Sequence, residues 1–329
     1  MKLIKKAQIF CLSALMLIAG CSCIKAAEIK ESRFESILKF SCGEKSDQLL
    51  WLFADNGGVF DGPFQGPMAF ITDKNGNFWI GDTLKARVAA FDNRGTLRKE
   101  IDLIEIAKKM KLASDPVLLD LIPGANGKML VADAANNAVI ELDVRGGASA
   151  VFRSQKSGSG FWNQINRIHC DRKGRIYVED IPAMRTVVLE KDGIAQKEAL
   201  EGEVGIAVNS EGQTAMIVMD TSNPMIRHVV MAPKPGEPPE KIAGFQAKEP
   251  ILWAALIGFD QKDRLYAIFD TETIRHYVVF AADGNIIRHQ VVDFPDPGYD
   301  PCRPDWIGPD GSIYTVKIEA ERLHILKLN

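Results

Sequence analysis

Short apolar runs of four to six residues, separated by turn-forming residues, dominate the chain after its first thirty positions. The stretch from Gly66 to Ile101 shows this pattern most clearly. Asn75-Gly76 within it is a strong signal for a tight hairpin between antiparallel strands. Its apolar runs predict four short strands, at Met68–Asp73, Asn77–Gly81, Arg87–Phe91 and Thr96–Ile101. Four antiparallel strands in about 36 residues match the size of one β-propeller blade.

The same unit recurs along the chain, and an acidic residue closes the second predicted strand of each copy. Successive copies of this acid lie 40 to 51 residues apart, which is the repeat length of four-stranded propeller blades. The six acids are Asp82, Asp133, Asp180, Asp220, Asp270 and Glu319. The chain is therefore predicted to be all-β, with six four-stranded antiparallel blades over residues 32–329. A helical spacing of apolar residues predicts one short helix at Leu103–Leu112.

The two ends of the predicted ring fit one another. The sixth copy stops after three strands at the C-terminus, whereas Phe34–Phe40 forms a strand-like segment that belongs to no N-terminal blade. Pairing of this segment with Leu323–Leu328 completes the sixth blade and leaves no exposed sheet edge at the seam. We therefore expect the propeller to be closed by an N-terminal strand.

Several of these copies resemble the NHL repeat family of six-bladed propellers. The resemblance rests on Gly76-Asn77-Phe78-Trp79-Ile80-Gly81-Asp82, followed by Arg87-Val88 and Phe91-Asp92-Asn93-Arg94-Gly95. Lys128–Asp133 with Asn136-Asn137, and Gly174–Asp180 with Arg185, are similar to the family as well. The resemblance covers residues 66–195 well and the later copies loosely. It implies a fold rather than a function, because NHL-type propellers include scaffolds, ligand binders and enzymes.

Residues 1–20 have the layout of a secretory signal. Three lysines are followed by an uncharged apolar run at Ala7–Ala19, which is too short to span a bilayer as a helix. Ile18-Ala19-Gly20-Cys21 then resembles a bacterial lipobox, with Ile in the usual Leu position. The resemblance implies cleavage before Cys21 and lipidation of that cysteine. Residues 21–31 are expected to form a tether, and the alternative is an ordinary signal peptide with a chance cysteine.

Charge and composition agree with an exported globular domain. Of the 329 residues, 46% are hydrophobic and 25% charged, as in ordinary soluble domains. Removal of residues 1–20 leaves 37 basic and 43 acidic side chains, a net charge of −6. No basic stripe is present, which argues against a nucleic-acid partner. A lipid-anchored location in the bacterial cell envelope is expected, and Ser22 after the cysteine favours the outer membrane by resemblance to sorting rules.

Features that recur in the blades are predicted to be structural. Asp82 with Arg87, Asp180 with Arg185 and Asp270 with Arg275 share a spacing of five residues. Each acid ends a second strand and each Arg begins a third strand, so the two side chains can pair across the connecting loop.

Residues that occur once, in loops leading into a first strand, are the candidates for binding. Aromatic and Arg side chains there combine a large contact area with a polar group, as binding surfaces do. The candidates are Trp162, Asn163, Arg167, Trp253, Arg303 and Trp306. The alternative is that Trp253 and Trp306 only fill the gaps between neighbouring blades.

Two classes of function remain open. The first is a membrane-anchored binding or assembly module that uses the channel mouth to hold a protein, peptide or glycan and needs no cofactor. The second, by fold analogy with gluconolactonase-like propellers, is a hydrolase or lyase with one calcium or zinc ion in the central channel. Its candidate oxygen ligands are Asp115, Asn163, Asn166 and Asn223. The five histidines show no metal-ligand spacing, so no catalytic or metal residue is assigned.

A disulfide between Cys42 and Cys302 is predicted for the exported chain. Export favours disulfides, Cys23 lies in the tether, and Cys170 ends a strand where a buried free thiol is common. Cys42 follows the outer strand of blade six, and Cys302 lies in the loop into that blade's first strand. The two loops are expected to be neighbours on one face of the ring. The alternative is a pair of free thiols.

Overall fold

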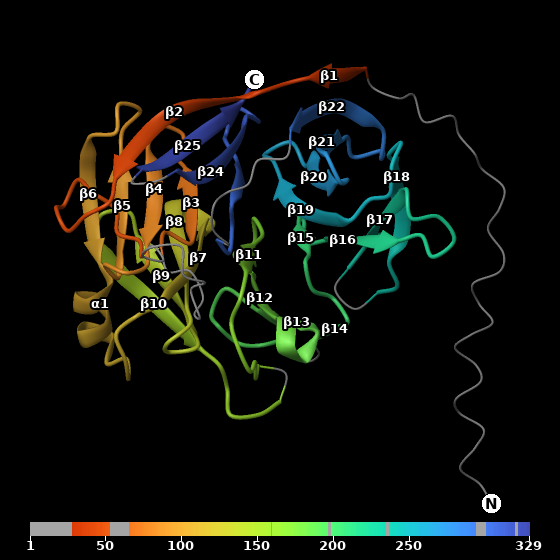
Figure 1. Ribbon diagram of the computed structural model, residues 1–329. Coiled ribbons are helices and arrows are strands. Elements are labelled where there is room, and N and C mark those ends of the chain that lie inside the picture. The colour runs from red at the N-terminus through yellow and green to blue at the C-terminus, as the bar shows by residue number, and fades with distance from the viewer. Residues whose placement is uncertain are drawn as a thin grey trace, which may run out of the picture.

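The fold is a ring of six antiparallel sheets around a central axis, as predicted (Figure 1). The computed structural model describes residues 28–52, 66–158, 160–196, 199–234, 237–293, 301–319 and 322–329. The signal segment, Cys21 and Cys23 lie outside these ranges.

Blades one to three each contain four sequential strands. Blade one is β3 (Ala69–Thr72), β4 (Phe78–Asp82), β5 (Arg87–Phe91) and β6 (Leu97–Asp102). Blade two is β7 (Leu118–Pro123), β8 (Lys128–Asp133), β9 (Ala138–Asp143) and β10 (Gly147–Arg153). Blade three is β11 (Ile168–Cys170), β12 (Ile176–Asp180), β13 (Arg185–Leu189) and β14 (Leu200–Glu201).

Blades four to six continue the ring. Blade four is β15 (Ala207–Val208), β16 (Thr214–Met219), β17 (Ile226–Ala232) and β18 (Glu240–Gln246). Blade five is β19 (Trp253–Phe259), β20 (Leu265–Asp270), β21 (Ile274–Phe280) and β22 (Ile286–Asp293). Blade six is β23 (Asp305–Ile307), β24 (Ile313–Glu319), β25 (Arg322–Leu328) and the N-terminal strand β2 (Phe34–Ser41).

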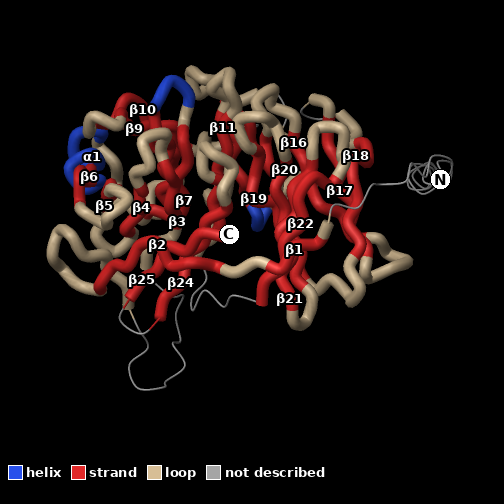
Figure 2. The backbone as a smooth tube through the Cα atoms, turned by 90° about the horizontal axis from the view of Figure 1, so that it is seen from above, coloured by secondary structure: helices blue, strands red, loops and turns tan. Residues whose placement is uncertain are grey.

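The predicted closure is confirmed, because β2 pairs antiparallel with β25 from Phe34 opposite Leu328 to Ser41 opposite Arg322. The segment just before it adds a feature that the sequence did not predict. Residues Ile29–Glu31, at the end of the predicted tether, form strand β1, which pairs in parallel with β22. Figures 1 and 2 show β1 and β2 running in succession along the outside of blades five and six, beside the C-terminus.

Most turns between first and second strands are stabilised by an Asp or Asn side chain and a glycine. In blade one, Asp73 Oδ1 accepts hydrogen bonds from the backbone N–H groups of Asn75 and Asn77. Gly76 supplies the left-handed conformation at φ 78°, which costs glycine little.

The equivalent turns of the six blades lie on one side of the ring, here called the hairpin face. The opposite side, where loops lead into each first strand, is called the loop face.

The predicted helix is α1 (Leu103–Met110), which buries Leu103, Ile106 and Ala107. Asp102 caps it by accepting hydrogen bonds from the N–H groups of Ile104 and Glu105. Two short 3₁₀ turns, η2 (Ala125–Gly127) and η3 (Ile181–Ala183), complete the helical elements of the described chain. No described helix is both long and apolar enough to cross a bilayer.

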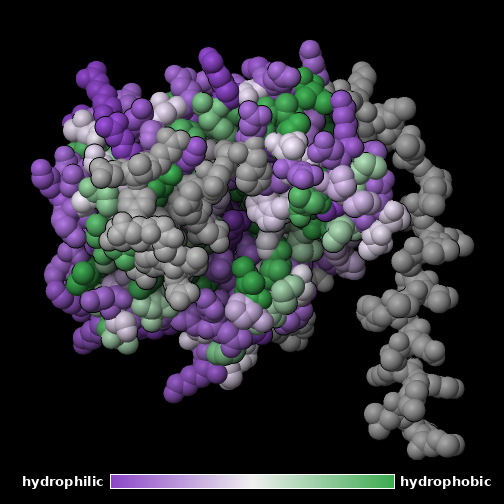
Figure 3. Space-filling model, in the orientation of Figure 1, coloured by the Kyte–Doolittle hydropathy of each residue, from purple (hydrophilic) through white to green (hydrophobic). Residues whose placement is uncertain are grey.

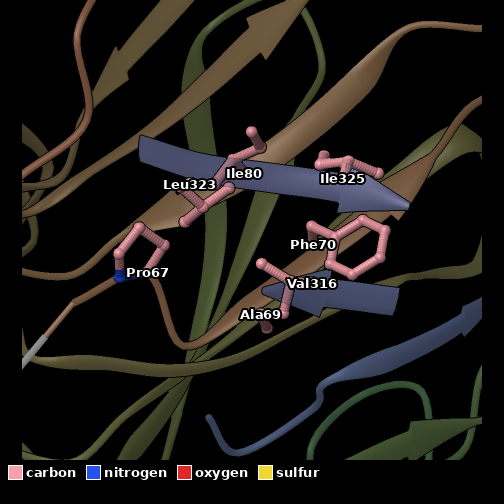
Figure 4. A pocket seen from close by; sticks show the side chains of 7 residues that line it. All are labelled: Pro67, Ala69, Phe70, Ile80, Val316, Leu323 and Ile325. Atoms are coloured by element: carbon pink, nitrogen blue, oxygen red, sulfur yellow. The ribbon is translucent and has the colours of Figure 1, made fainter. Parts of the chain in front are cut away.

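Apolar side chains between neighbouring blades form the core. At the seam, Phe40 of β2 packs on Phe91 of blade one with ring centroids 4.6 Å apart. A small apolar gap of about 10 Å³ remains between blades one and six, lined by Pro67, Ala69, Phe70, Ile80, Val316, Leu323 and Ile325 (Figure 4). A gap of this size and polarity is a packing defect rather than a ligand site.

The predicted Asp–Arg pairs form as expected. The Asp82–Arg87 and Asp270–Arg275 pairs close at 3.0 and 2.8 Å, and the Asp180–Arg185 pair at 3.7 Å. In each case the acid lies directly opposite its Arg across the second and third strands. Their repetition around the ring supports a structural role.

The predicted Cys42–Cys302 disulfide is not formed, because both cysteines are free thiols. Cys302 precedes the innermost strand of blade six, and Cys42 follows the outermost one. Three strand spacings separate these strands, or about 14 Å, and a disulfide requires Cα atoms within about 7 Å. The loops that carry Cys42 and Cys302 belong to the same blade but start at its opposite radial ends, so they are not neighbours.

Candidate functional site

The main cavity of the described chain lies along the propeller axis and opens among the turns of the hairpin face. Its volume is about 980 Å³, within the range of small-molecule sites. The turns of all six blades contribute to its rim, including Asn75, Asn126, Arg172, Ser210, Gln261 and Pro309. We call this space the channel cavity. It extends outward between blades one and two as far as Lys99 and Val144.

The walls of the channel cavity are mainly apolar because the innermost strand of each blade contributes branched or aromatic side chains. These are Ile71, Ile122, Ile168, Val208, Ile257, Phe259 and Ile307, with Trp306 beside them. Apolar walls with a few polar groups at each end are typical of sites for organic ligands.

Three of the rim turns are joined to one another. Arg172 Nη2 donates to the carbonyl of Gln261 at 3.1 Å, which links blade three to blade five. Ser210 of blade four donates to Asp263 of blade five through both its N–H and its hydroxyl, at 3.0 and 2.7 Å. These bonds hold one side of the cavity mouth in a defined shape.

A buried ion pair lies at the inner end of the channel cavity, away from the turns. Arg303 Nε and Nη2 donate to Oδ1 and Oδ2 of Asp120, at 2.8 Å each. Asp120 also accepts the N–H groups of Leu121 and Ile168 at 2.9 Å. Burial raises the pKa of Asp120, but the Arg303 charge outweighs it, and the net pKa is lowered. The pair is therefore ionised and fully hydrogen-bonded on the carboxylate side.

A second polar pair lies next to the first. His169 Nε2 is 2.6 Å from Glu179 Oε1, and Glu179 Oε2 accepts the N–H of Gly205 at 2.7 Å. Glu179 is fully buried, whereas 10% of the His169 side chain is exposed and lines the channel cavity. Burial raises the pKa of Glu179, but the contact with His169 and the nearby Arg167 lower it by more, so the net pKa is reduced. The carboxylate is thus held in its charged form.

Only two of the predicted binding residues line this cavity. Arg303 forms its inner end, and Trp306 lies in its wall, where Nε1 donates to Thr72 Oγ1 of blade one at 3.2 Å. The Trp306 contact joins blade six to blade one, as the gap-filling alternative expected. The sequence predicts these residues as part of a surface at the loop face, whereas the channel cavity opens at the hairpin face.

The other predicted binding residues lie elsewhere. Trp162 is fully buried between blades two and three, and its position is that of a core residue. Asn163 is exposed, and its N–H donates to Asp180 at 2.7 Å. Trp253 is 46% exposed and lies under the Arg275 guanidinium, 5.8 Å from the ring centre. These residues do not form one site.

Arg167 is the predicted residue that approaches the cavity without lining it. Its Nε donates to the carbonyl of Cys302 at 3.0 Å, next to Arg303. Arg167 is therefore hydrogen-bonded to the residue directly before Arg303. Figure 3 shows hydrophilic residues near the centre of the face in view, with hydrophobic residues beside them.

The predicted oxygen ligands for a channel metal are not brought together. Asp115 is exposed, Asn223 Oδ1 accepts the N–H of Met225, and Asn166 faces the Cys302 thiol. Within the described ranges, no group of three or more His, Cys, Asp and Glu side chains is arranged to hold a metal ion. We assign no metal ligands.

Asp120, His169 and Glu179 were missed by the sequence prediction, although the repeat contained a signal for two of them. Glu179 directly precedes Asp180, the acid that closes the second strand of blade three. The equivalent residues of the other blades are Gly81, Ala132, Met219, Phe269 and Ile318. His169 lies two residues before Asp171, which begins the turn between the first and second strands of blade three. The equivalent residues of the other blades are Ile71, Ile122, Ala207, Gly258 and Trp306. Only blade three places titratable groups at either position, which marks the pair as unique rather than periodic.

Comparison with known proteins supports the fold. A structure from the DUF4221 family of Bacteroides vulgatus has a TM-score of 0.54 at 11% identity and covers 91% of this chain and 98% of its own. Regucalcin from Agrobacterium tumefaciens, a calcium-binding protein, has a TM-score of 0.50 at 12% identity over 92% and 97%.

A third solved structure is a catalytically inactive virginiamycin B lyase from Staphylococcus aureus with quinupristin, with a TM-score of 0.50 at 12% identity over 85% and 99%. At these identities the likeness concerns the propeller fold alone. No family model matches the chain, and no curated protein matches it.

Proposed function

We propose that this chain is a lipid-anchored protein of the bacterial cell envelope whose propeller binds a small organic ligand in the channel cavity. One observation carries the binding part of the proposal. The cavity of about 980 Å³ is lined by the innermost strands of all six blades and has apolar walls between two polar ends.

The polar groups at the inner end support a selective site rather than a simple gap. Arg303 and Asp120 are buried charges, and buried charges are retained at a cost unless they are well paired. Because hydrogen bonds within the protein fix this pair and the joined rim turns, little ordering is needed on binding. The ligand can be a free small molecule or the end of a glycan or peptide that enters from the hairpin face.

The location part of the proposal rests on the N-terminal sequence. The basic start, the uncharged apolar run and the lipobox-like Ile18–Cys21 support export and anchoring through Cys21. The anchored chain then presents the propeller outside the cytoplasm, held to the membrane by two or more acyl chains.

A cavity-filling variant tests the binding part. Val208 lies in the cavity wall, so Val208→Phe should weaken binding of the probe 8-anilinonaphthalene-1-sulfonate, followed by its fluorescence. We expect at least about a tenfold weaker affinity, since loss of 1.4 kcal/mol gives that factor. The matched control is Leu252→Ala, which removes a 68% exposed side chain outside the cavity. Equal binding by wild type and Val208→Phe, or loss only in Leu252→Ala, would show that the probe binds elsewhere.

A further inference from the structure

The hydrogen-bond pattern of His169 determines which ring nitrogen is left without a partner in the described chain. Glu179 is ionised and therefore only accepts hydrogen bonds. The short contact with Glu179 thus places a proton on Nε2 of His169, between the two side chains. Nδ1 has no hydrogen-bond partner among the described residues, and the side chain lines the channel cavity. When the ring carries only this proton, its lone pair is on Nδ1 and is available to whatever occupies the cavity.

Arg303 provides a cationic donor at the segment that carries His169, and both residues line the channel cavity. Its Nη2 donates to the carbonyl of Ile168, the residue directly before His169, at 3.0 Å. Nε and Nη2 are used by Asp120 and Ile168, whereas Nη1 has no hydrogen-bond partner in the described part of the chain. The inner end of the cavity therefore combines a proton acceptor with a fixed positive group.

We propose that His169 is a general base for a ligand in the channel cavity, that Glu179 is its positioning residue and that Arg303 stabilises the anion that forms. This inference rests on the proposed ligand binding and adds an activity to it. A base and a cation without a positioned nucleophile suit base-promoted elimination from a carbon acid that carries an oxygen leaving group. The nearby thiols do not supply a nucleophile, because burial raises the pKa of Cys170 to about 11 and that of Cys302 to about 12.

The proposed step balances without a co-reactant. Nδ1 takes the proton from carbon, and the C–H electron pair forms a new π bond in the product. The bond to the leaving oxygen breaks, and this oxygen takes the bonding pair as an anion beside Arg303. The imidazolium keeps its Nε2–H bond to Glu179 and later returns the Nδ1 proton to the product oxygen or to water.

Chemical modification tests whether the lone pair is open. Diethyl pyrocarbonate acylates neutral imidazole nitrogens, and peptide mass spectrometry locates the modified histidines in the native protein. We expect His169 to be modified in wild type and protected by 8-anilinonaphthalene-1-sulfonate. In Glu179→Gln the new amide can donate to Nε2, which moves the ring proton to Nδ1, so modification should slow. An unmodified His169 in native wild type would overturn the inference.

Elimination from 5-nitrobenzisoxazole, followed by the absorbance of the phenolate product, tests the base itself. We expect saturable turnover above buffer and a loss of about 10²-fold or more in His169→Asn. Glu179→Gln should lower kcat with little change in KM and should alter the pH profile of kcat, which a purely structural role would not do. Arg167, Arg303 and Asp120 are the other charged groups around the pair and stay intact in both variants.

A second histidine provides the matched control. His228 Nε2 lies 3.1 Å from Asp220, a similar pair that does not line the channel cavity. His228→Asn should leave turnover unchanged. Absence of turnover in wild type, or equal turnover in His169→Asn, would overturn the base assignment. If 8-anilinonaphthalene-1-sulfonate still binds in a Val208-dependent way, the proposed binding function survives that result.

Discussion

Arg303 and Asp120, 183 residues apart in the chain, form a two-point ion pair with both N–O distances at 2.8 Å. Both side chains are almost fully buried at the inner end of the channel cavity. The pair joins the segment before blade six to the first strand of blade two, and Arg303 also donates to Ile168 of blade three. A single side chain therefore connects three blades at the axis.

We predict that Arg303→Met is strongly destabilising, because it leaves the Asp120 carboxylate buried without its cation. The expected loss in unfolding free energy is about 3–5 kcal/mol, measured by urea denaturation. In the double variant Asp120→Asn with Arg303→Met, the unpaired charge is absent. We therefore expect the double variant to lose less than the sum of the two single variants. Additive losses would show that the two side chains are not energetically coupled.

The seam of the ring gives a second prediction. Phe40 of β2 is 3% exposed and packs on Phe91 of blade one. Phe40→Ala should cost about 3–5 kcal/mol through lost burial and the cavity left behind. Lys39→Ala, which changes the neighbouring exposed side chain of the same strand, should stay within about 0.5 kcal/mol. Equal thermal unfolding of Phe40→Ala and wild type would contradict the view that β2 closes the ring.

The architecture could be predicted from the sequence because short turn motifs and a repeated spacing of residues determine it. Asn75-Gly76 specifies a hairpin within a few residues, and the closing acids from Asp82 to Glu319 repeat the blade length. Five of the six acids end a second strand in the structure, and Asp220 directly follows Met219 at the end of β16. The closure followed from counting strands at the two termini.

The site was harder to predict because it is made by contacts between distant segments. Nothing local shows that Arg303 meets Asp120, or that the cavity opens beside Arg172 rather than beside Trp253. An aromatic residue in a loop does not by itself mark a binding surface, since Trp162 lies in the core. When the six repeats are aligned, Glu179 and His169 are titratable, whereas the equivalent positions of the other five blades are not. This comparison needs only the sequence.

The N-terminal segment gives a prediction about location. Cys21→Ala should abolish acylation, followed by labelling with a radioactive fatty acid, and should move the protein from the membrane to the soluble fraction. The reason is that stable anchoring depends on acyl chains, and Ile18–Cys21 is the segment that resembles a lipobox. Cys23→Ala, two residues further on, is the matched control and should be labelled and fractionate like wild type. Continued labelling of Cys21→Ala would refute the prediction.

A buried histidine pair in blade five predicts how stability depends on pH. His276 Nδ1 and His289 Nε2 are 3.0 Å apart, and both rings contact Phe245 of blade four. Burial, and then the neighbouring His276, lower the pKa of His289 to about 4. Burial also lowers the pKa of His276. The fold therefore keeps at least one of the two rings neutral at a pH where free histidine is protonated.

The direction of the effect follows from the proton balance. Below the ordinary histidine pKa of about 6.5, the unfolded chain binds a proton that His289 in the folded chain does not bind. The folded state consequently has its full stability above pH 6.5 and loses it progressively as the pH falls towards 4. The lowered pKa of His289 corresponds to up to about 3 kcal/mol of unfolding free energy.

We expect His289→Gln, which cannot titrate, to show a smaller loss of unfolding free energy than wild type between pH 6.5 and 4 in urea titrations. An equal loss in both proteins would mean that other groups cause the acid sensitivity. Strand β1 lies against His289, with Ile29 opposite it, so hydrogen exchange in β1 should rise in wild type over the same pH range, after correction for the intrinsic exchange rate.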